Sequence, residues 1–142
     1  MWVVKQTEDH KKWFSSLPES SKVKYLTFVK VLAEGGPALM RPYVGKIEGS
    51  RHANMKELIV DELPDYQYRS LFVFDTNREA ILLLGGNKLV NGTYDVGFYD
   101  RLIPRADLLV DAHEARLRKE REKRETNSGK ARKGGKAGKK VR

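Results

Sequence analysis

Hydrophobic positions recur every three to four residues in two stretches near the N-terminus. The first stretch follows Thr7, a residue suited to cap a helix, and ends at Pro18. The second covers residues 19–34, where hydrophobic side chains form one wide stripe, and it stops at the Gly-Gly-Pro of residues 35–37. A short hydrophobic run, residues 2–5, precedes both. This part of the chain therefore predicts one strand followed by two helices.

Three hydrophobic runs of strand length come next. They cover residues 55–60, 66–75 and 80–85. The link between the last two is short and polar, so we expect them to form an antiparallel hairpin. Residues 81–84 are apolar throughout, which is typical of a central strand that is covered on both faces.

A last periodic stretch runs from about Ile103 to Leu117 and predicts a helix, which Pro104 either begins or kinks. The predicted order is β-α-α-β-β-β-α. This order is typical of an α+β fold in which a small antiparallel sheet is flanked by helices.

The hydrophobic periodicity stops after Leu117, and the charge distribution changes at the same place. The chain of 142 residues has a net charge of +9, and residues 116–142 alone contain 13 Lys and Arg against 3 Glu. Residues 1–115 hold 15 basic and 16 acidic residues, so their net charge is −1. We predict a folded domain over residues 1–117 and a basic, Lys- and Gly-rich disordered tail over residues 118–142. Within this tail, residues 118–125 could extend the last helix as a charged, solvated rod. The simplest interpretation of the tail is a solvated appendage, and any RNA binding by it would be nonspecific and salt-dependent.

Composition excludes several classes of chemistry. There is no cysteine, which excludes disulfides, thiolate zinc sites and cysteine nucleophiles. The histidines are scattered, so we expect neither a metal site nor a cofactor; His10 is predicted on the surface of the first helix and His113 in the interior. The N-terminus lacks the apolar run of a signal peptide, and the longest apolar stretch, residues 80–84, is too short to cross a membrane. We therefore expect a cytoplasmic protein without a membrane partner.

Three basic residues lie at the edges or ends of the predicted strands: Lys56, Arg69 and Lys88. On neighbouring antiparallel strands they could converge on one patch that holds a phosphodiester, because Arg offers a planar fork and Lys a mobile point charge. In the alternative interpretation, each is a solvated strand residue that balances a nearby carboxylate such as Glu57 or Asp61.

Further polar and aromatic groups lie close to these cations in the sequence. His52, in a polar loop, could transfer protons near neutral pH, or it is an ordinary surface histidine. Tyr99 lies just before the last helix, where an aromatic ring beside cations could stack on an unpaired base. The candidate RNA-binding residues are Arg51, Asn54, Arg78 and Tyr94.

Four segments together resemble a known family. They are GSRHANMKEL (49–58), RSLFVFD (69–75), AILLLGGNK (80–88) and IPRAD (103–107). In this order and spacing they are similar to the phage-derived, HigB-like branch of the RelE/ParE toxin superfamily, over about residues 2–117. The resemblance implies a RelE-like fold and the toxin of a type II toxin–antitoxin pair. It further implies metal-independent cleavage of mRNA in the ribosomal A site, with mRNA, the ribosome and a helix-turn-helix antitoxin as partners.

In such cleavage the ribose 2′-OH attacks the adjacent phosphate, so the protein must position the backbone, neutralise charge and move two protons. Carried over by position, the resemblance implies that Lys56, Arg69 and Lys88 hold the phosphate. It implies proton transfer or base stacking for Tyr99 or His52.

The chain departs from the family pattern at two positions. Relatives often have Arg where this chain has Ile59 and Asp where it has Asn87, which leaves the acid–base assignment open. Two alternatives are a non-catalytic ParE-like toxin that binds DNA gyrase, and a basic-tailed RNA- or ribosome-binding module with a degenerate toxin domain. Converging cations favour RNA chemistry, because a protein clamp has no need of them.

Overall fold

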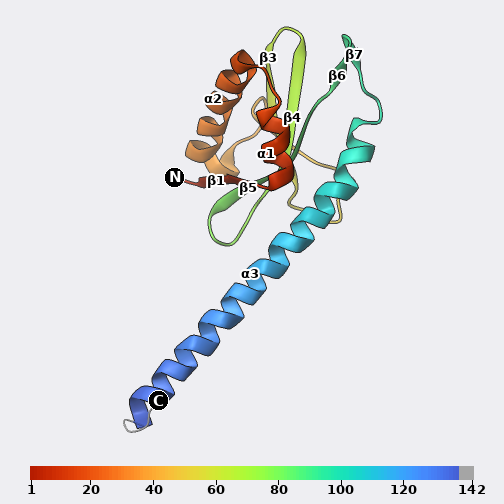
Figure 1. The fold of residues 1–142 in the computed structure, drawn as a ribbon. Helices are drawn as coiled ribbons and strands as arrows, with labels where there is room; N and C mark the ends of the chain where they lie inside the picture. The colour runs from red at the N-terminus through yellow and green to blue at the C-terminus, as the bar shows by residue number, and fades with distance from the viewer. Residues whose placement is uncertain (138–142) are drawn as a thin grey trace. The chain divides into compact units, whose positions relative to one another are not determined.

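A computed structural model describes residues 1–137 (Figure 1). The elements are β1 (Val3–Gln6), α1 (Glu8–Ser15), α2 (Glu19–Gly35), η1 (Gly36–Ala38), β2 (Val44–Lys46), β3 (Lys56–Leu63), β4 (Tyr66–Phe74), β5 (Glu79–Asn87), β6 (Leu89–Val90), β7 (Thr93–Tyr94) and α3 (Phe98–Ala137). The chain divides into two units, Met1–Val110 and a second that begins at Asp111 inside α3. The predicted α+β class and the predicted long elements are confirmed.

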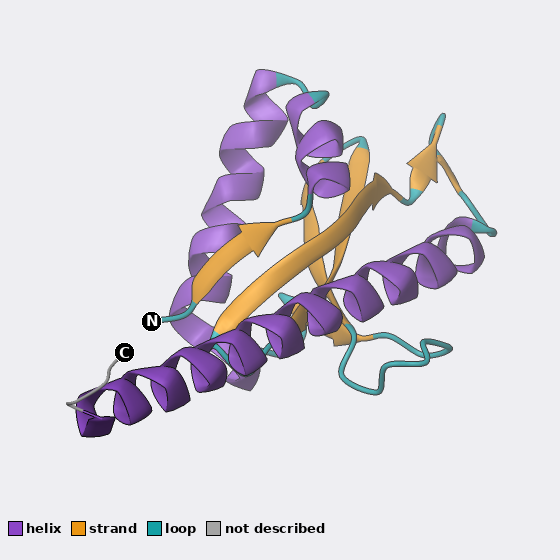
Figure 2. Ribbon diagram, turned by 60° about the horizontal axis from the view of Figure 1, so that its bottom comes forward, coloured by secondary structure: helices purple, strands orange, loops and turns teal. Residues whose placement is uncertain are grey.

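Five strands form one sheet in the order β1-β5-β4-β3-β2 (Figure 2). The pairs β2–β3, β3–β4 and β4–β5 are antiparallel, which confirms the predicted hairpin of β4 and β5. The pair β1–β5 is parallel, so the sheet is mixed rather than purely antiparallel as the sequence predicted. The sequence could not predict the parallel direction of β1, because two helices and three other strands separate β1 from β5 along the chain. The strands β2, β6 and β7 were also missed, because runs of two or three residues carry no readable alternation.

Each face of the sheet is covered by a separate hydrophobic cluster. On one face, Leu71 and Leu83 pack with residues of α3 such as Ile103. On the other face, Phe72 and Leu82 pack with residues of α2, among them Tyr25, Phe28 and Leu32. Residues 80–83 of β5 therefore alternate between two cores, which confirms that this strand is central and covered on both faces.

His10 lies in the interior, which corrects the prediction that it is a surface residue. Its side chain is fully buried, and its ring contacts Gln6 Oε1 at 2.8 Å, Ser70 Oγ at 2.8 Å and Tyr25 OH at 3.1 Å. His10 precedes Trp13 by three residues, so both side chains lie on the face of α1 that points inward. Burial lowers the pKa of His10 to about 4, and the ring is therefore neutral near pH 7.

The last helix departs from the prediction at both ends. It begins at Phe98 rather than near Ile103, so Pro104 lies inside the helix, and of the two predicted alternatives the one in which Pro104 begins the helix is wrong. It continues to Ala137, so it covers residues 118–125, which the sequence allowed as an extension of the helix, and also residues 126–137, where the sequence predicted disorder. Ala, Arg, Lys and Glu favour helix, and the segment extends a helix that is already formed. His113 is partly exposed rather than buried. The end of the predicted tail, residues 138–142, lies outside the described residues.

Within residues 1–137, none of the helices has both the length and the apolar composition that crossing a bilayer requires.

Candidate functional site

A hollow of about 340 Å³ opens on the face of the sheet where β3 and β4 meet the beginning of α3. Its lining residues are Arg41, Lys46, Ile47, Glu48, Glu57, Arg69, Lys88 and Tyr99. Four of the eight are basic and two are acidic, so a net positive charge surrounds the opening. Such a surface suits an anionic group that also needs a proton acceptor close by.

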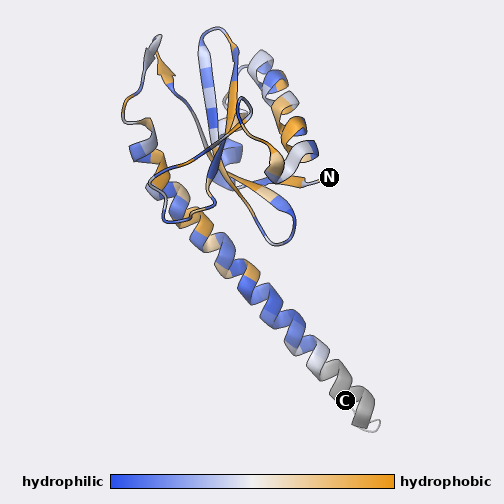
Figure 3. Cartoon of the chain, turned by 180° about the vertical axis from the view of Figure 1, so that it is seen from behind, coloured by the Kyte–Doolittle hydropathy of each residue, from blue (hydrophilic) through white to orange (hydrophobic). Residues whose placement is uncertain are grey.

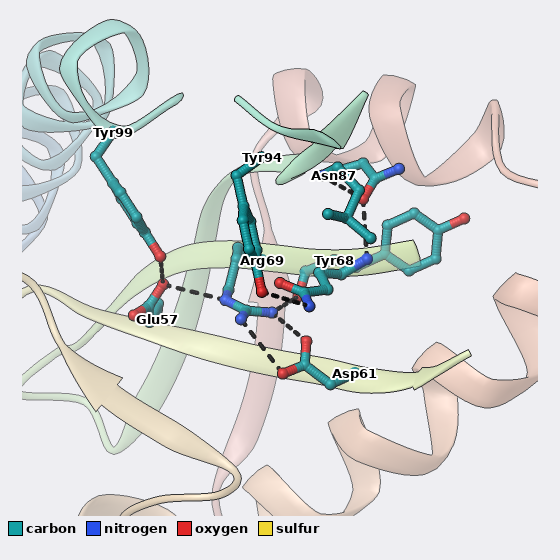
Figure 4. Close-up of polar contacts among 9 residues, drawn as sticks. Glu57, Asp61, Tyr68, Arg69, Asn87, Tyr94 and Tyr99 are labelled. Atoms are coloured by element: carbon teal, nitrogen blue, oxygen red, sulfur yellow. Dashed lines mark hydrogen bonds and ion pairs between the residues drawn. The ribbon is translucent and has the colours of Figure 1, made fainter. Parts of the chain in front are cut away.

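Arg69 lies at the centre of this site, with only 7% of its side chain exposed. It stands opposite Ile59 on β3, so Glu57 and Asp61, two residues to either side of Ile59, are its diagonal neighbours on the same face (Figure 4). Arg69 Nη1 donates to Asp61 Oδ1 at 2.6 Å and to the Tyr68 carbonyl at 3.0 Å. Arg69 Nε lies 3.6 Å from Glu57 Oε1.

The guanidinium of Arg69 is therefore held by the protein itself. Burial acts to lower the pKa of Arg69, but the hydrogen bond and charge of Asp61, together with the charges of Tyr99 and Glu57, outweigh it, so that this pKa is raised and the cation is retained. A cation fixed between two carboxylates positions its neighbours, and it has little freedom to follow a ligand.

Tyr99 and Glu57 form the second part of the site. The Tyr99 hydroxyl donates to Glu57 Oε1 at 2.6 Å (Figure 4). Burial and this hydrogen bond to Glu57 raise the pKa of Tyr99, so the phenol keeps its proton at neutral pH. On the far side of the carboxylate, Gly45 of β2 pairs with Glu57, and a Cβ there would lie 3.2 Å from both Glu57 Oε2 and Arg41 Nη2. A glycine at this position thus leaves room for Arg41 beside the carboxylate.

Lys88 has more freedom than Arg69. Its ammonium lies 5.2 Å from the ring centroid of Tyr99 and 5.8 Å from that of Tyr94, within the range of cation–π attraction. The preceding residue, Asn87, accepts backbone hydrogen bonds from Gln67 and Leu89 through its side-chain oxygen. Asn87 therefore fixes the strand end from which Lys88 projects.

The structure thus brings three of the predicted site residues, Arg69, Lys88 and Tyr99, to one hollow, with Tyr94 beside Lys88. Lys56 does not line this hollow, so the predicted convergence of three cations is wrong for this lysine. Successive strand residues point to opposite faces, and Glu57, which follows Lys56, is the one that points to Arg69.

The polar loop before β3 is fixed to α3 instead of lining the hollow. Ser50 Oγ donates to Asp107 Oδ1 at 2.5 Å, and the Arg51 side chain forms an ion pair with the same carboxylate. The backbone N–H of His52 donates to Ser50 Oγ at 2.9 Å. Arg51, His52 and Asn54 are therefore not among the lining residues, which removes His52 from the position that proton transfer at the hollow would need.

Arg78 is also away from the hollow. It lies in the turn that follows the end of β4, whereas Arg69 lies near the beginning of that strand. Its guanidinium is 4.8 Å from the centroid of the Trp2 ring. Arg78 therefore lies against Trp2, away from the hollow.

Sequence reasoning missed several members of the site. Glu57 and Asp61 were considered only as charges that balance the cations, and Arg41, Lys46 and Glu48 were not singled out. The spacing of Glu57 and Asp61 around Ile59 was a usable signal, but it needs the register that places Ile59 opposite Arg69.

The domain just described matches a known protein family. The family model "Phage derived protein Gp49-like (DUF891)" matches residues 12–111. The chain belongs to this family. The match covers the strands from β2 to β7, the hollow and the first turns of α3, and it confirms the resemblance inferred from the four sequence segments.

Two proteins of Mycobacterium tuberculosis are similar to this Gp49-like chain. "Putative toxin HigB2" is 38% identical over 112 residues, which are 79% of this chain and 54% of that protein. "Putative toxin HigB3" is 40% identical over 96 residues, which are 68% of this chain and 79% of that protein. The chain thus spans about half the length of the first of these relatives.

Solved structures give weaker matches. The intact E. coli RelBE toxin–antitoxin complex matches with a TM-score of 0.49 and 11% identity, over 63% of this chain and 100% of that chain. The archaeal RelE–RelB complex from Pyrococcus horikoshii OT3 matches with a TM-score of 0.45 and 23% identity, over 61% and 93% of the two chains.

Proposed function

We propose that this Gp49-like protein is the toxin of a type II toxin–antitoxin pair and that it cleaves mRNA on the ribosome. The observation that carries the proposal is the hollow in which Lys88, Arg69, Glu57 and Tyr99 meet. The names of the mycobacterial relatives support the toxin assignment. The partner that follows from it is a small antitoxin.

The chemistry of the hollow fits attack by a ribose 2′-OH on its own 3′-phosphate. The phosphate lies against Lys88 and Arg41, which neutralise the charge that develops on its oxygens. Glu57 accepts the proton of the 2′-OH, and Lys88 gives a proton to the departing 5′-oxygen. The bond from phosphorus to the 5′-oxygen breaks as the bond to the 2′-oxygen forms, and the products are a 2′,3′-cyclic phosphate and a 5′-OH. None of these steps requires a metal ion.

Arg69 and Tyr99 act on Glu57 in this scheme. The hydroxyl of Tyr99 and the guanidinium of Arg69 hold the same oxygen, Glu57 Oε1. The other oxygen, Oε2, lies on the side of Gly45 and Arg41 and is the one that we assign to the 2′-OH. Preorganising a base in this way avoids a reorganisation cost during the reaction.

The test uses purified protein, translating ribosomes and a defined message, with breaks mapped by primer extension. We expect breaks that leave a 5′-OH, and we expect Lys88→Gln to reduce their rate about 100-fold. The matched control is Lys56→Gln, which removes the same charge from a lysine that does not line the hollow and should leave the rate unchanged. Equal losses in the two variants would contradict the assignment of the site.

The outcome also separates the alternatives. An intact message together with inhibited DNA supercoiling would support the gyrase-binding function instead. An intact message together with retained binding to ribosomes would support a degenerate RNA- or ribosome-binding module. Arg69→Ala should abolish cleavage too, but its buried ion pairs make a folding check by circular dichroism necessary.

A further inference from the structure

The part of α3 that begins at Asp111 has no role in the site described above. It forms a unit of its own, and the match to the family model ends at residue 111. The hollow and the hydrophobic clusters draw on α3 only as far as Val110. A helix that continues to Ala137 therefore calls for a separate explanation.

From residue 118 onward, this helix lacks an apolar face. From residue 118 to residue 137 the sequence contains no Val, Ile, Leu, Met, Phe, Trp or Tyr. The coloured part of α3 is almost wholly hydrophilic in this region (Figure 3), and residues 118–128 are all exposed. A helix without an apolar stripe cannot pack into a protein core or a coiled coil, and it cannot insert into the headgroup layer of a membrane.

The charge of this segment is strongly positive. Residues 116–125 contain six basic and three acidic residues, and residues 126–142 contain seven basic residues and no acidic residue. In contrast, residues 1–110 hold 15 basic and 14 acidic residues, so the first unit is close to neutral. Cations at this density repel one another, and a polyanion would relieve that repulsion.

The helix also presents cations side by side. Arg116, Lys119 and Lys123 are spaced by three and four residues, which places them on one face, and all three are exposed. A row of this kind can follow the phosphates of a nucleic-acid backbone.

From these observations we propose that α3 from Asp111 onward binds the phosphate backbone of RNA without sequence preference. The occupant is RNA rather than an anionic membrane, because stable membrane attachment needs apolar groups in addition to charge, and residues 118–137 contain no large apolar residue. The inference goes beyond the proposed cleavage and does not depend on it.

The test measures binding of the full chain to a fluorescent 2′-O-methyl oligoribonucleotide, which has no free 2′-OH and cannot be cleaved by the proposed chemistry. Anisotropy titrations at several salt concentrations give the slope of log Kd against log salt. The helix variant replaces three cations by Gln: Arg116→Gln, Lys119→Gln and Lys123→Gln. The control variant removes the same charge from exposed lysines of α1 and α2: Lys11→Gln, Lys12→Gln and Lys30→Gln.

We expect the helix variant to bind about tenfold more weakly or worse near 0.1 M salt, and its slope to fall by about two, since each lost contact with single-stranded RNA removes roughly 0.7. The control variant should retain its slope. Equal losses in both variants would show that only net charge matters. Binding to phosphatidylserine vesicles that is as tight as binding to RNA would indicate that the partner is a membrane. Either result overturns the proposal. Because binding is measured without cleavage, failure of the nuclease proposal would leave this result unaffected.

Discussion

At the scale of single residues, the hollow assigns different tasks to cations that look alike in the sequence. Arg69 is buried and held by Asp61 and Glu57, so it can position a carboxylate but cannot move to a ligand. At the hollow, the ammonium of Lys88 contacts only the rings of Tyr94 and Tyr99 among the described residues, and it can therefore move towards a phosphate.

Tyr99→Phe tests whether Glu57 is a positioned base. The change removes the only hydroxyl seen to donate to Glu57 Oε1 among the described residues, while the ring is kept. We expect the single-turnover cleavage rate to fall about 100-fold, and the free energy of unfolding to fall by about 1–2 kcal/mol because a buried carboxylate loses a partner. Tyr43→Phe removes a hydroxyl from a tyrosine that is 38% exposed, and it should change neither quantity. An unchanged rate in Tyr99→Phe would remove this residue from the mechanism.

His10 predicts a specific dependence of stability on pH. Its pKa of about 4 in the folded protein lies below the ordinary value of 6.5, so the unfolded chain binds more protons between these two values. Stability is therefore present above about pH 6.5 and is lost as the pH falls towards 4, with a loss of about 2 kcal/mol between pH 7 and pH 5 from this residue.

Urea denaturation at pH 7 and pH 5 measures this loss. A His10→Gln variant cannot titrate at this position, so its stability should change by about 2 kcal/mol less than that of the wild type over the same interval. The groups that face the ring are neutral: Gln6, Tyr25 and Ser70. An identical pH dependence in the two proteins would mean that His10 does not control it.

At the scale of elements, β5 shows how much can be read from the sequence. An uninterrupted apolar run predicted a central strand, and both of its faces are indeed covered. The same strand contains two glycines just before its last residue, Gly85 and Gly86, whose role the sequence could not show. A Cβ at Gly85 would overlap the indole of Trp13, so the glycine lets α1 lie close against the sheet.

Gly85→Ala should therefore destabilise the protein by about 1–3 kcal/mol, because the new methyl group forces Trp13 from its place. Thermal or urea denaturation measures the effect. Gly129→Ala is a suitable control, since a Cβ there meets nothing within 4 Å and the residue lies in a helix. Destabilisation of equal size in both variants would show that packing against Trp13 is not the cause.

At the scale of the whole molecule, a nearly neutral folded unit is joined to a strongly basic helix. The net charge of +9 is thus misleading as a description of the folded unit, whose candidate site depends on a few local cations. The two units are proposed to perform separate tasks, cleavage at the hollow and retention on RNA by the helix.

The toxin assignment predicts a partner that can be identified genetically. Expression of the chain should arrest growth, and co-expression of a small helix-turn-helix protein encoded beside it should restore growth, because the antitoxin blocks the toxin. Colony counts with and without the neighbouring gene measure this. If the Lys88→Gln variant still arrested growth, toxicity would not depend on the hollow.

The sequence by itself determined the class of fold, the long helices and strands, the central position of β5, the family and the separation of charge along the chain. These properties depend on local periodicity and composition, which can be read from the sequence without knowing how the strands pair. Tertiary structure alone decided that β1 runs parallel to β5, that His10 is buried, and that Glu57 rather than Lys56 points to Arg69. These outcomes depend on register and on packing between distant segments, and a shift of one residue in a strand would have reversed which side chain faces the site.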